Sequence, residues 1–130
     1  MNLFDSSAII NLCRENKIDE LLEGWTLNLA FYELGNAIWK QVYIHKAITI
    51  NEANKILDPI TQIFRKMRKP KTEDASEILK IAVKEGITYY DASYIQAAVQ
   101  NSLTLVTDDE KLYKISKNYI ETLKSDELQS

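Results

Sequence analysis

Apolar positions along the chain follow two periods, and their order predicts short strands separated by helices. The apolar run 1–4 is too short for a helix and is followed, after three polar residues, by a helical pattern over 8–13. The same patterns predict the remaining elements, namely helices over 17–23, 30–43, 48–67, 72–84 and 88–99 and strands over 25–29, 103–106 and 119–123. Strands that alternate with helices indicate an α/β sandwich of three layers, with a mostly parallel sheet covered by helices on both faces.

A few residue types predict where these helices begin and end. Thr-x-x-Glu capping boxes at 49–52 and 107–110 mark two helix starts. Gly24 and Gly86 are expected to stop the helices that precede them. Pro59 lies inside the 48–67 pattern, and we expect it to kink or split that helix because proline lacks a backbone N–H.

Length and composition favour one globular domain over residues 1–130, with a polar tail from about residue 124 that should fray. The chain is 45% hydrophobic and 27% charged, and its three Gly and two Pro argue against disorder. Cys13, the single cysteine, excludes a disulfide framework. No apolar run reaches the roughly 18 residues of a membrane span, and no secretory leader pattern opens the chain. We therefore expect a cytoplasmic protein that does not contact a membrane.

The charge distribution contains one basic cluster in an otherwise acidic chain. The net charge of −3 gives no global sign of nucleic-acid binding. The cluster consists of Arg65, Lys66, Arg68, Lys69 and Lys71. Two explanations remain open: cations favoured at the C-terminal end of a helix, or a surface that contacts RNA phosphates.

Several acidic residues lie where a carboxylate is costly, close to strand ends or apolar helix faces. Asp5 follows the first predicted strand, and the pair Asp108 and Asp109 follows the strand at 103–106. Glu33 lies one turn into a helix, and Asp91 lies in the first turn of a helix rich in small apolar residues. Helix capping or simple exposure could explain each acid separately.

Together, these acids predict a metal site. Functional groups of open parallel sheets gather at the carboxyl ends of the strands, so we expect the carboxylates to meet there. Clustered carboxylates repel one another, and a hard cation such as Mg²⁺ or Mn²⁺ relieves that repulsion.

Four segments, in this order and spacing, resemble the PIN domain family. They are Leu3-Phe4-Asp5-Ser6-Ser7-Ala8, Tyr32-Glu33-Leu34-Gly35-Asn36, Tyr90-Asp91-Ala92-Ser93-Tyr94 and Leu105-Val106-Thr107-Asp108-Asp109-Glu110-Lys111-Leu112. The resemblance covers nearly the whole chain. In length and layout, the chain is similar to a VapC-type toxin ribonuclease of a VapBC toxin–antitoxin system.

The resemblance implies a set of site residues. The acidic quartet of the family corresponds to Asp5, Glu33, Asp91 and Asp109. The family pattern Thr-x-Asp selects Asp109 as the ligand over Asp108. The hydroxyl residues of the same pocket correspond to Ser6 and Thr107.

The resemblance also implies an activity and partners. The implied activity is an endoribonuclease that depends on Mg²⁺ or Mn²⁺, in which a metal-bound water attacks the phosphodiester. The implied partners are a VapB-like antitoxin and a second copy of the chain. Apolar residues in excess of one small core support a homodimer, namely Trp39, Tyr43, Ile44 and Ile48.

Other functions fit the sequence less well. His45 is the only histidine, and no phosphate-binding Gly-rich loop or Cys/His metal spacing occurs. A receiver-type domain would need an Asp pair at its first strand, and a haloacid-dehalogenase-like phosphatase would need Asp-x-Asp where Asp5-Ser6-Ser7 stands. A catalytically inactive PIN fold that binds RNA or protein is the alternative from another class.

Overall fold

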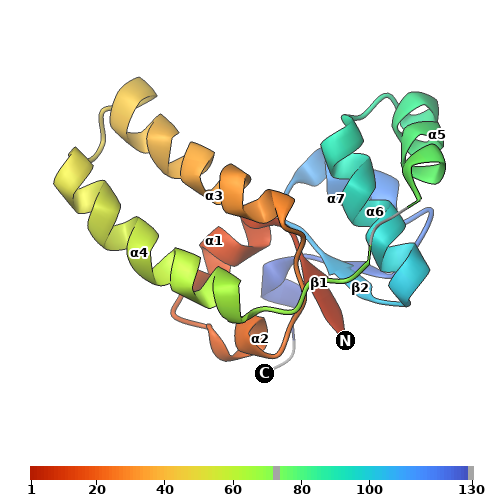
Figure 1. Ribbon diagram of the computed structural model, residues 1–130, viewed down its shortest axis with the longest axis horizontal. Helices are drawn as coiled ribbons and strands as arrows, with labels where there is room; N and C mark the ends of the chain where they lie inside the picture. The colour runs from red at the N-terminus through yellow and green to blue at the C-terminus, as the bar shows by residue number, and fades with distance from the viewer. Residues whose placement is uncertain (72–73, 129–130) are drawn as a thin grey trace.

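A short parallel sheet lies at the centre of the molecule. The computed structural model describes residues 1–71 and 74–128 (Figure 1). Strands β1 (Asn2–Phe4), β2 (Thr104–Val106) and β3 (Thr122–Leu123) pair in parallel in the order β1-β2-β3. On the other side of β1, Trp25 forms single parallel bridges with Leu3 and Arg68. The first strand therefore pairs with a segment about one hundred residues away, as expected for an α/β fold.

Helices cover both faces of this sheet. In chain order they are α1 (Ser6–Arg14), α2 (Asp19–Leu22), α3 (Leu29–Trp39), α4 (Ile50–Lys66), α5 (Ala75–Glu85), α6 (Tyr89–Asn101) and α7 (Glu110–Ser116). A π-helical segment, η1 (Lys40–Ile44), continues α3, and a 3₁₀ turn, η2 (Ser125–Glu127), follows β3. Figure 1 shows α3 and α4 as a long hairpin on one side and α5 and α6 on the other.

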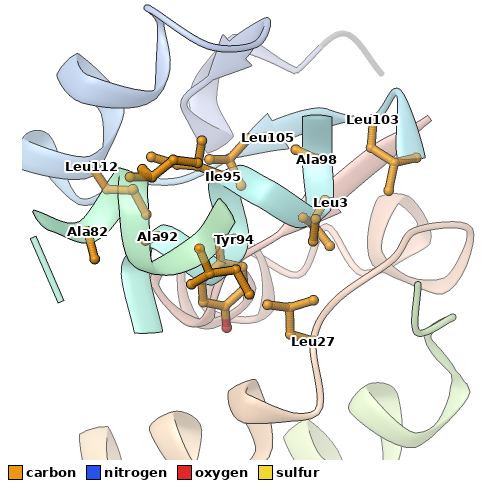
Figure 2. Packing of buried hydrophobic residues seen from close by; sticks show 13 residues of the cluster. Leu3, Leu27, Ala82, Ala92, Tyr94, Ile95, Ala98, Leu103, Leu105 and Leu112 are labelled. Atoms are coloured by element: carbon orange, nitrogen blue, oxygen red, sulfur yellow. The ribbon is translucent and has the colours of Figure 1, made fainter. Parts of the chain in front are cut away.

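Alternation along the strands builds one hydrophobic core on each face. Leu3 and Leu105 belong to a cluster with α5, α6 and α7 (Figure 2), whereas Phe4 and Val106 belong to a cluster with α1, α3 and α4. Successive strand residues point to opposite faces, so two adjacent apolar residues per strand are enough to supply both cores. The predicted three-layer α/β sandwich is therefore confirmed.

The predicted strand over 25–29 is wrong beyond its first residue. Within this range only Trp25 forms bridges. The Thr26 amide donates to the Arg68 carbonyl oxygen at 2.9 Å, and its hydroxyl donates to the Phe4 carbonyl oxygen at 2.7 Å. The chain then enters α3 at Leu29.

The predicted split of the helix at Pro59 does not occur, since α4 continues through this residue from Ile50 to Lys66. Pro59 and Lys55, the residue whose carbonyl loses its helical partner, are both exposed. Water can therefore satisfy that carbonyl without splitting the helix.

The predicted helix ends and capping residues agree with the structure at some positions and not at others. Gly86 ends α5 at a φ of 66°, and Thr49 forms its capping box with Glu52. Gly24 does not cap a helix in the left-handed region; instead, a Cβ atom there would collide with the ring of Phe4. The predicted capping box at Thr107 is wrong because Asp109 caps α7.

Two further boundaries differ from the prediction. Helix α5 begins at Ala75 with Asp74 as its cap, and the predicted start at Thr72 lies outside the described residues. The tail was expected to fray, but Ser125 is buried in a 3₁₀ turn, so this expectation is wrong for 124–128. None of the helices in the described ranges is long and apolar enough to cross a bilayer.

Candidate active site

Asp5 lies at the carboxyl end of β1 and is almost completely buried, with 5% of its surface exposed. It caps α1, because its Oδ1 accepts hydrogen bonds from the Ala8 amide at 3.0 Å and the Ser7 hydroxyl at 2.7 Å. Its Oδ2 accepts a short hydrogen bond from the Thr107 hydroxyl at the end of β2. Asp5 is therefore both the N-cap of α1 and a member of the polar site.

Burial raises the pKa of Asp5 to about 6, and the neighbouring Glu33 carboxylate acts in the same direction. The hydrogen bonds from Thr107, Ala8 and Ser7 favour the ionised form and oppose this rise. In the described ranges no Lys or Arg forms an ion pair with Asp5, and its pKa of about 6 lies close to neutral pH.

Glu33 on α3 and Asp91 on α6 extend the acidic region. Burial raises the pKa of half-buried Glu33, and Asp91 raises it further. The Tyr94 hydroxyl opposes this by donating to Glu33 Oε1 at 2.7 Å. Burial likewise raises the pKa of Asp91, with Asp109 adding to the effect and Lys111 opposing it. The four carboxylates of the predicted quartet thus affect one another in a chain from Asp5 to Asp109.

The structure separates the two aspartates that follow β2. Asp108 accepts hydrogen bonds from Asn11 Nδ2 at 2.8 Å, from the Ser125 amide at 2.8 Å and from the Ser125 hydroxyl at 2.6 Å. Asp109 is exposed and uses only Oδ1, to cap α7 through the Leu112 amide at 2.8 Å. Asp108 is therefore occupied by structural contacts, and Asp109 is the member of the pair that couples to Asp91.

The donor set fits a hard divalent cation in its chemistry. All four groups supply carboxylate oxygens, and in the described ranges none of them forms an ion pair with Lys or Arg. Partly buried negative charges without a counter-ion are costly, and Mg²⁺ and Mn²⁺ prefer oxygen ligands. Among the described residues, no three His, Cys, Asp or Glu side chains lie close enough together to hold a metal ion as they stand.

Three contacts at this site were missed by the sequence interpretation. Ser7, and not only Ser6, supplies a hydroxyl to the acidic region. Tyr94 holds Glu33, and Ser125 holds Asp108 from the tail. A signal existed for Tyr94, which lies three residues after Asp91 and so on a neighbouring part of the same helix face. The sequence gives no signal for the contact of Ser125, which is non-local.

A polar groove of about 340 Å³ adjoins the acidic region on the α3 side. Ser6 and Glu33 line it together with Lys40 and His45 from the π-helical end of α3. Ser6 therefore lies beside Glu33, while Thr107 lies beside Asp5.

The basic cluster divides into two groups. Lys69 donates to the carbonyl oxygens of Phe64 at 2.8 Å and Met67 at 2.6 Å, and its ammonium lies 4.2 Å from the centroid of the Phe64 ring. Lys69 therefore stabilises the C-terminal end of α4, as the helix-end explanation predicts. The other four members are exposed, namely Arg65, Lys66, Arg68 and Lys71.

Comparison with known proteins identifies the fold family. The family described as PIN domain matches residues 3–118. The chain belongs to the PIN-domain family. Among PIN domains it is similar to proteins named VapC: Exonuclease VapC9 of Pyrobaculum aerophilum is 35% identical over 95 residues, which are 73% of this chain and 68% of that protein. Ribonuclease VapC3 of the same organism is 31% identical over 102 residues, or 75% of each chain.

A solved structure supports the same assignment. The crystal structure of PAE2754 from Pyrobaculum aerophilum superposes on this PIN domain with a TM-score of 0.79 and 28% identity. The superposition covers 96% of this chain and 83% of that one. The VapC-type PIN resemblance of the sequence motifs is therefore confirmed.

Burial of Asp5 predicts how the stability of the metal-free PIN domain changes with pH. Its pKa rises from 3.8 to about 6 on folding, so the folded state binds more protons than the unfolded state between these values. The contribution is fully present below about pH 4 and is lost as pH rises through about 6, amounting to about 3 kcal/mol. In EDTA, urea unfolding should show the parent losing stability relative to Asp5→Asn as pH rises from 4 to 7.

Asp126→Asn is the matched control, because Asp126 is an exposed aspartate outside the acidic region. Its difference from the parent should be the same at each pH. A constant difference between the parent and Asp5→Asn over this range would contradict the burial argument.

Proposed function

We propose that this VapC-type PIN domain is an endoribonuclease that depends on Mg²⁺ or Mn²⁺ and is the cytoplasmic toxin of a toxin–antitoxin pair. The observation that carries the proposal is a series of four neighbouring carboxylates. Three of them are buried or partly buried, and none forms an ion pair with Lys or Arg in the described ranges. The nuclease names of both curated relatives support the reaction class.

In this proposal, Asp5, Glu33, Asp91 and Asp109 hold the metal. A bound ion of this kind activates water and stabilises charge on a phosphoryl group. The protein groups around the acids fix their orientation: Thr107 holds Asp5, as does Ser7, and Tyr94 holds Glu33. These hydrogen bonds favour the ionised carboxylates, which are the forms that bind a cation.

RNA and protein partners have separate candidate surfaces. The exposed basic side chains near the C-terminal end of α4 are the proposed contacts to RNA phosphates. An apolar groove of about 540 Å³, lined by Ile10, Ile38 and Ile60 among others, is the proposed seat of a VapB-like antitoxin. The exposed stack of Trp39 on Tyr43, with centroids 5.4 Å apart, is the proposed contact in a homodimer.

A cleavage assay tests the proposal directly. Circular and linear single-stranded RNA, and DNA of the same sequence, are incubated with the protein in Mg²⁺, in Mn²⁺ or in EDTA. We expect cleavage of both RNAs with either metal and none in EDTA, because the carboxylates alone offer no nucleophile or charge stabilisation for the phosphodiester.

Each other result has a defined meaning. Cleavage in EDTA would contradict metal dependence, and cleavage of linear RNA alone would indicate an exonuclease. Binding of RNA without cleavage in any metal would favour the alternative function, a catalytically inactive module.

A further inference from the structure

Exposed aromatic side chains flank the acidic region. Tyr32 and Tyr90 directly precede Glu33 and Asp91, and 73% and 61% of their respective surfaces are exposed. Tyr89 is also exposed beside Tyr90 at the start of α6. Exposed aromatic rings at such positions offer apolar faces on which a flat ligand can stack.

Two of these rings line a small hollow. Tyr89 and Tyr90 form one wall, Asn28 and its neighbours before α3 form another, and Lys69 with Pro70 closes the third side. Its volume of about 210 Å³ is smaller than the roughly 300–1,000 Å³ of sites for drug-sized ligands. The hollow suits a single planar ring rather than a folded segment.

The cation at this hollow is held in place. Lys69 donates two hydrogen bonds to backbone carbonyls of α4 and its C-terminus, at 2.8 and 2.6 Å. An ammonium group has three donors, so within the described residues one N–H remains for a ligand. A fixed positive charge beside aromatic rings is a combination that suits an anion attached to a flat ring.

The aromatic surface continues from Lys69 toward Tyr32. The Lys69 ammonium lies over the Phe64 ring, Phe64 packs on Phe31 with centroids 5.6 Å apart, and Phe31 packs on Tyr32 at 5.2 Å. Aromatic rings and the Lys69 ammonium therefore form a border of the acidic region, from Tyr90 on α6 to Tyr32 on α3.

We propose that the hollow between Tyr90, Tyr89 and Lys69 is a subsite for one base of single-stranded RNA. The base stacks on Tyr90, and Lys69 contacts an adjoining phosphate. A single strand is required because the faces of a paired base are covered by its neighbours in the duplex. Tyr90 and Asp91 both lie in the first turn of α6, so the stacked base lies within about one helical turn of the phosphodiester that the proposed nuclease cuts. The subsite rests on the proposed function and adds the form of RNA that it accepts.

Binding of a short oligoribonucleotide that carries one 2-aminopurine tests the subsite. The proteins carry Asp5→Asn, so that the RNA remains intact, and affinity is measured by the fluorescence anisotropy of a dye at one end of the RNA. We expect Tyr90→Leu to weaken binding about 5- to 100-fold and to remove the quenching caused by stacking. Tyr90→Phe should retain both, because it keeps the ring.

Ile50→Ala is the control for loss of an exposed apolar side chain. Ile50 is 63% exposed, close to the value of Tyr90, but it begins α4 at the far end of the α3–α4 hairpin (Figure 1). It should bind RNA like the parent. A second measurement changes the RNA instead of the protein, so a folding defect cannot explain its result. Replacing the 2-aminopurine by an abasic nucleotide should weaken binding to the parent. The same replacement should not further weaken binding to Tyr90→Leu.

Three outcomes would overturn the subsite. If the protein without substitutions cuts RNA but Tyr90→Leu and the abasic RNA bind normally, the subsite is wrong and the proposed function stands. If the protein neither binds nor cuts RNA, both are wrong. If Tyr90→Leu loses affinity for a VapB-type antitoxin but not for RNA, the hollow is a protein-docking surface.

Discussion

Asp5→Asn is expected to lower the rate of RNA cleavage by about a thousandfold or more with the fold intact. The substitution keeps the shape of the side chain but removes the buried charge at the carboxyl end of β1. Electrostatic stabilisation by a bound metal contributes several kcal/mol to catalysis, and each ~1.4 kcal/mol changes the rate about tenfold. Initial rates in Mn²⁺ with a fluorescent RNA measure the loss, and calorimetric titration with Mn²⁺ measures the affinity of the metal site.

The control for this experiment is Asp126→Asn, which removes an exposed carboxylate at η2 and should cut RNA at the parental rate. Circular dichroism and urea unfolding of Asp5→Asn establish that the fold is retained. If Asp5→Asn cleaved as fast as the parent, Asp5 would have no part in catalysis and the metal site would have to lie elsewhere.

Substitutions of the neighbouring residues Asp108 and Asp109 should have opposite effects: one should lower stability and the other should lower activity. Asp108→Ala removes an ionised acceptor of three hydrogen bonds, which leaves the partly buried amide of Ser125 without a partner. We expect a cost of about 2–4 kcal/mol in the free energy of unfolding. Below its unfolding temperature, the variant should cut RNA at the parental rate.

Asp109→Asn should behave in the reverse manner. Asparagine caps a helix as well as aspartate does, so the free energy of unfolding should change by less than about 0.5 kcal/mol. Cleavage should fall about a hundredfold or more, because one of the proposed metal ligands loses its charge. Urea unfolding and cleavage rates measured on both variants decide the assignment. Unchanged cleavage by Asp109→Asn together with loss by Asp108→Ala would reverse it.

Local sequence patterns predict most of the fold because they report local contacts. The strand 1–4 and its turn at Asp5 follow from a short apolar run before a good cap, and the structure has both. Thr88 likewise caps α6 through the Asp91 amide at 3.0 Å. These elements depend on neighbours within four residues, which the sequence displays directly.

Predictions fail where a distant group competes with a local one. Thr107 has the sequence of a capping residue, but its hydroxyl donates to Asp5 from the next strand, and Asp109 caps α7 instead. The tail looks free because its anchor, Asp108, lies seventeen residues earlier.

The candidate site shows the same division. Sequence motifs predict which acids to examine and, through the Thr-x-Asp pattern, favour Asp109 over Asp108. They do not predict that Tyr94 holds Glu33, or that Asp108 is occupied by Asn11 and Ser125. Such contacts depend on the packing of side chains between helices, which a periodic pattern does not describe.

The pairing of the first strand with residues 104–106 has a consequence for biosynthesis. A ribosome that has made two thirds of this chain has produced Asp5 but neither β2, which completes the sheet, nor Thr107, which holds the Asp5 carboxylate. The nuclease pocket therefore cannot assemble on the nascent polypeptide until β2 and Thr107 have left the ribosome. An enzyme that degrades RNA is thus kept inactive by its own topology while these first 107 residues are being made.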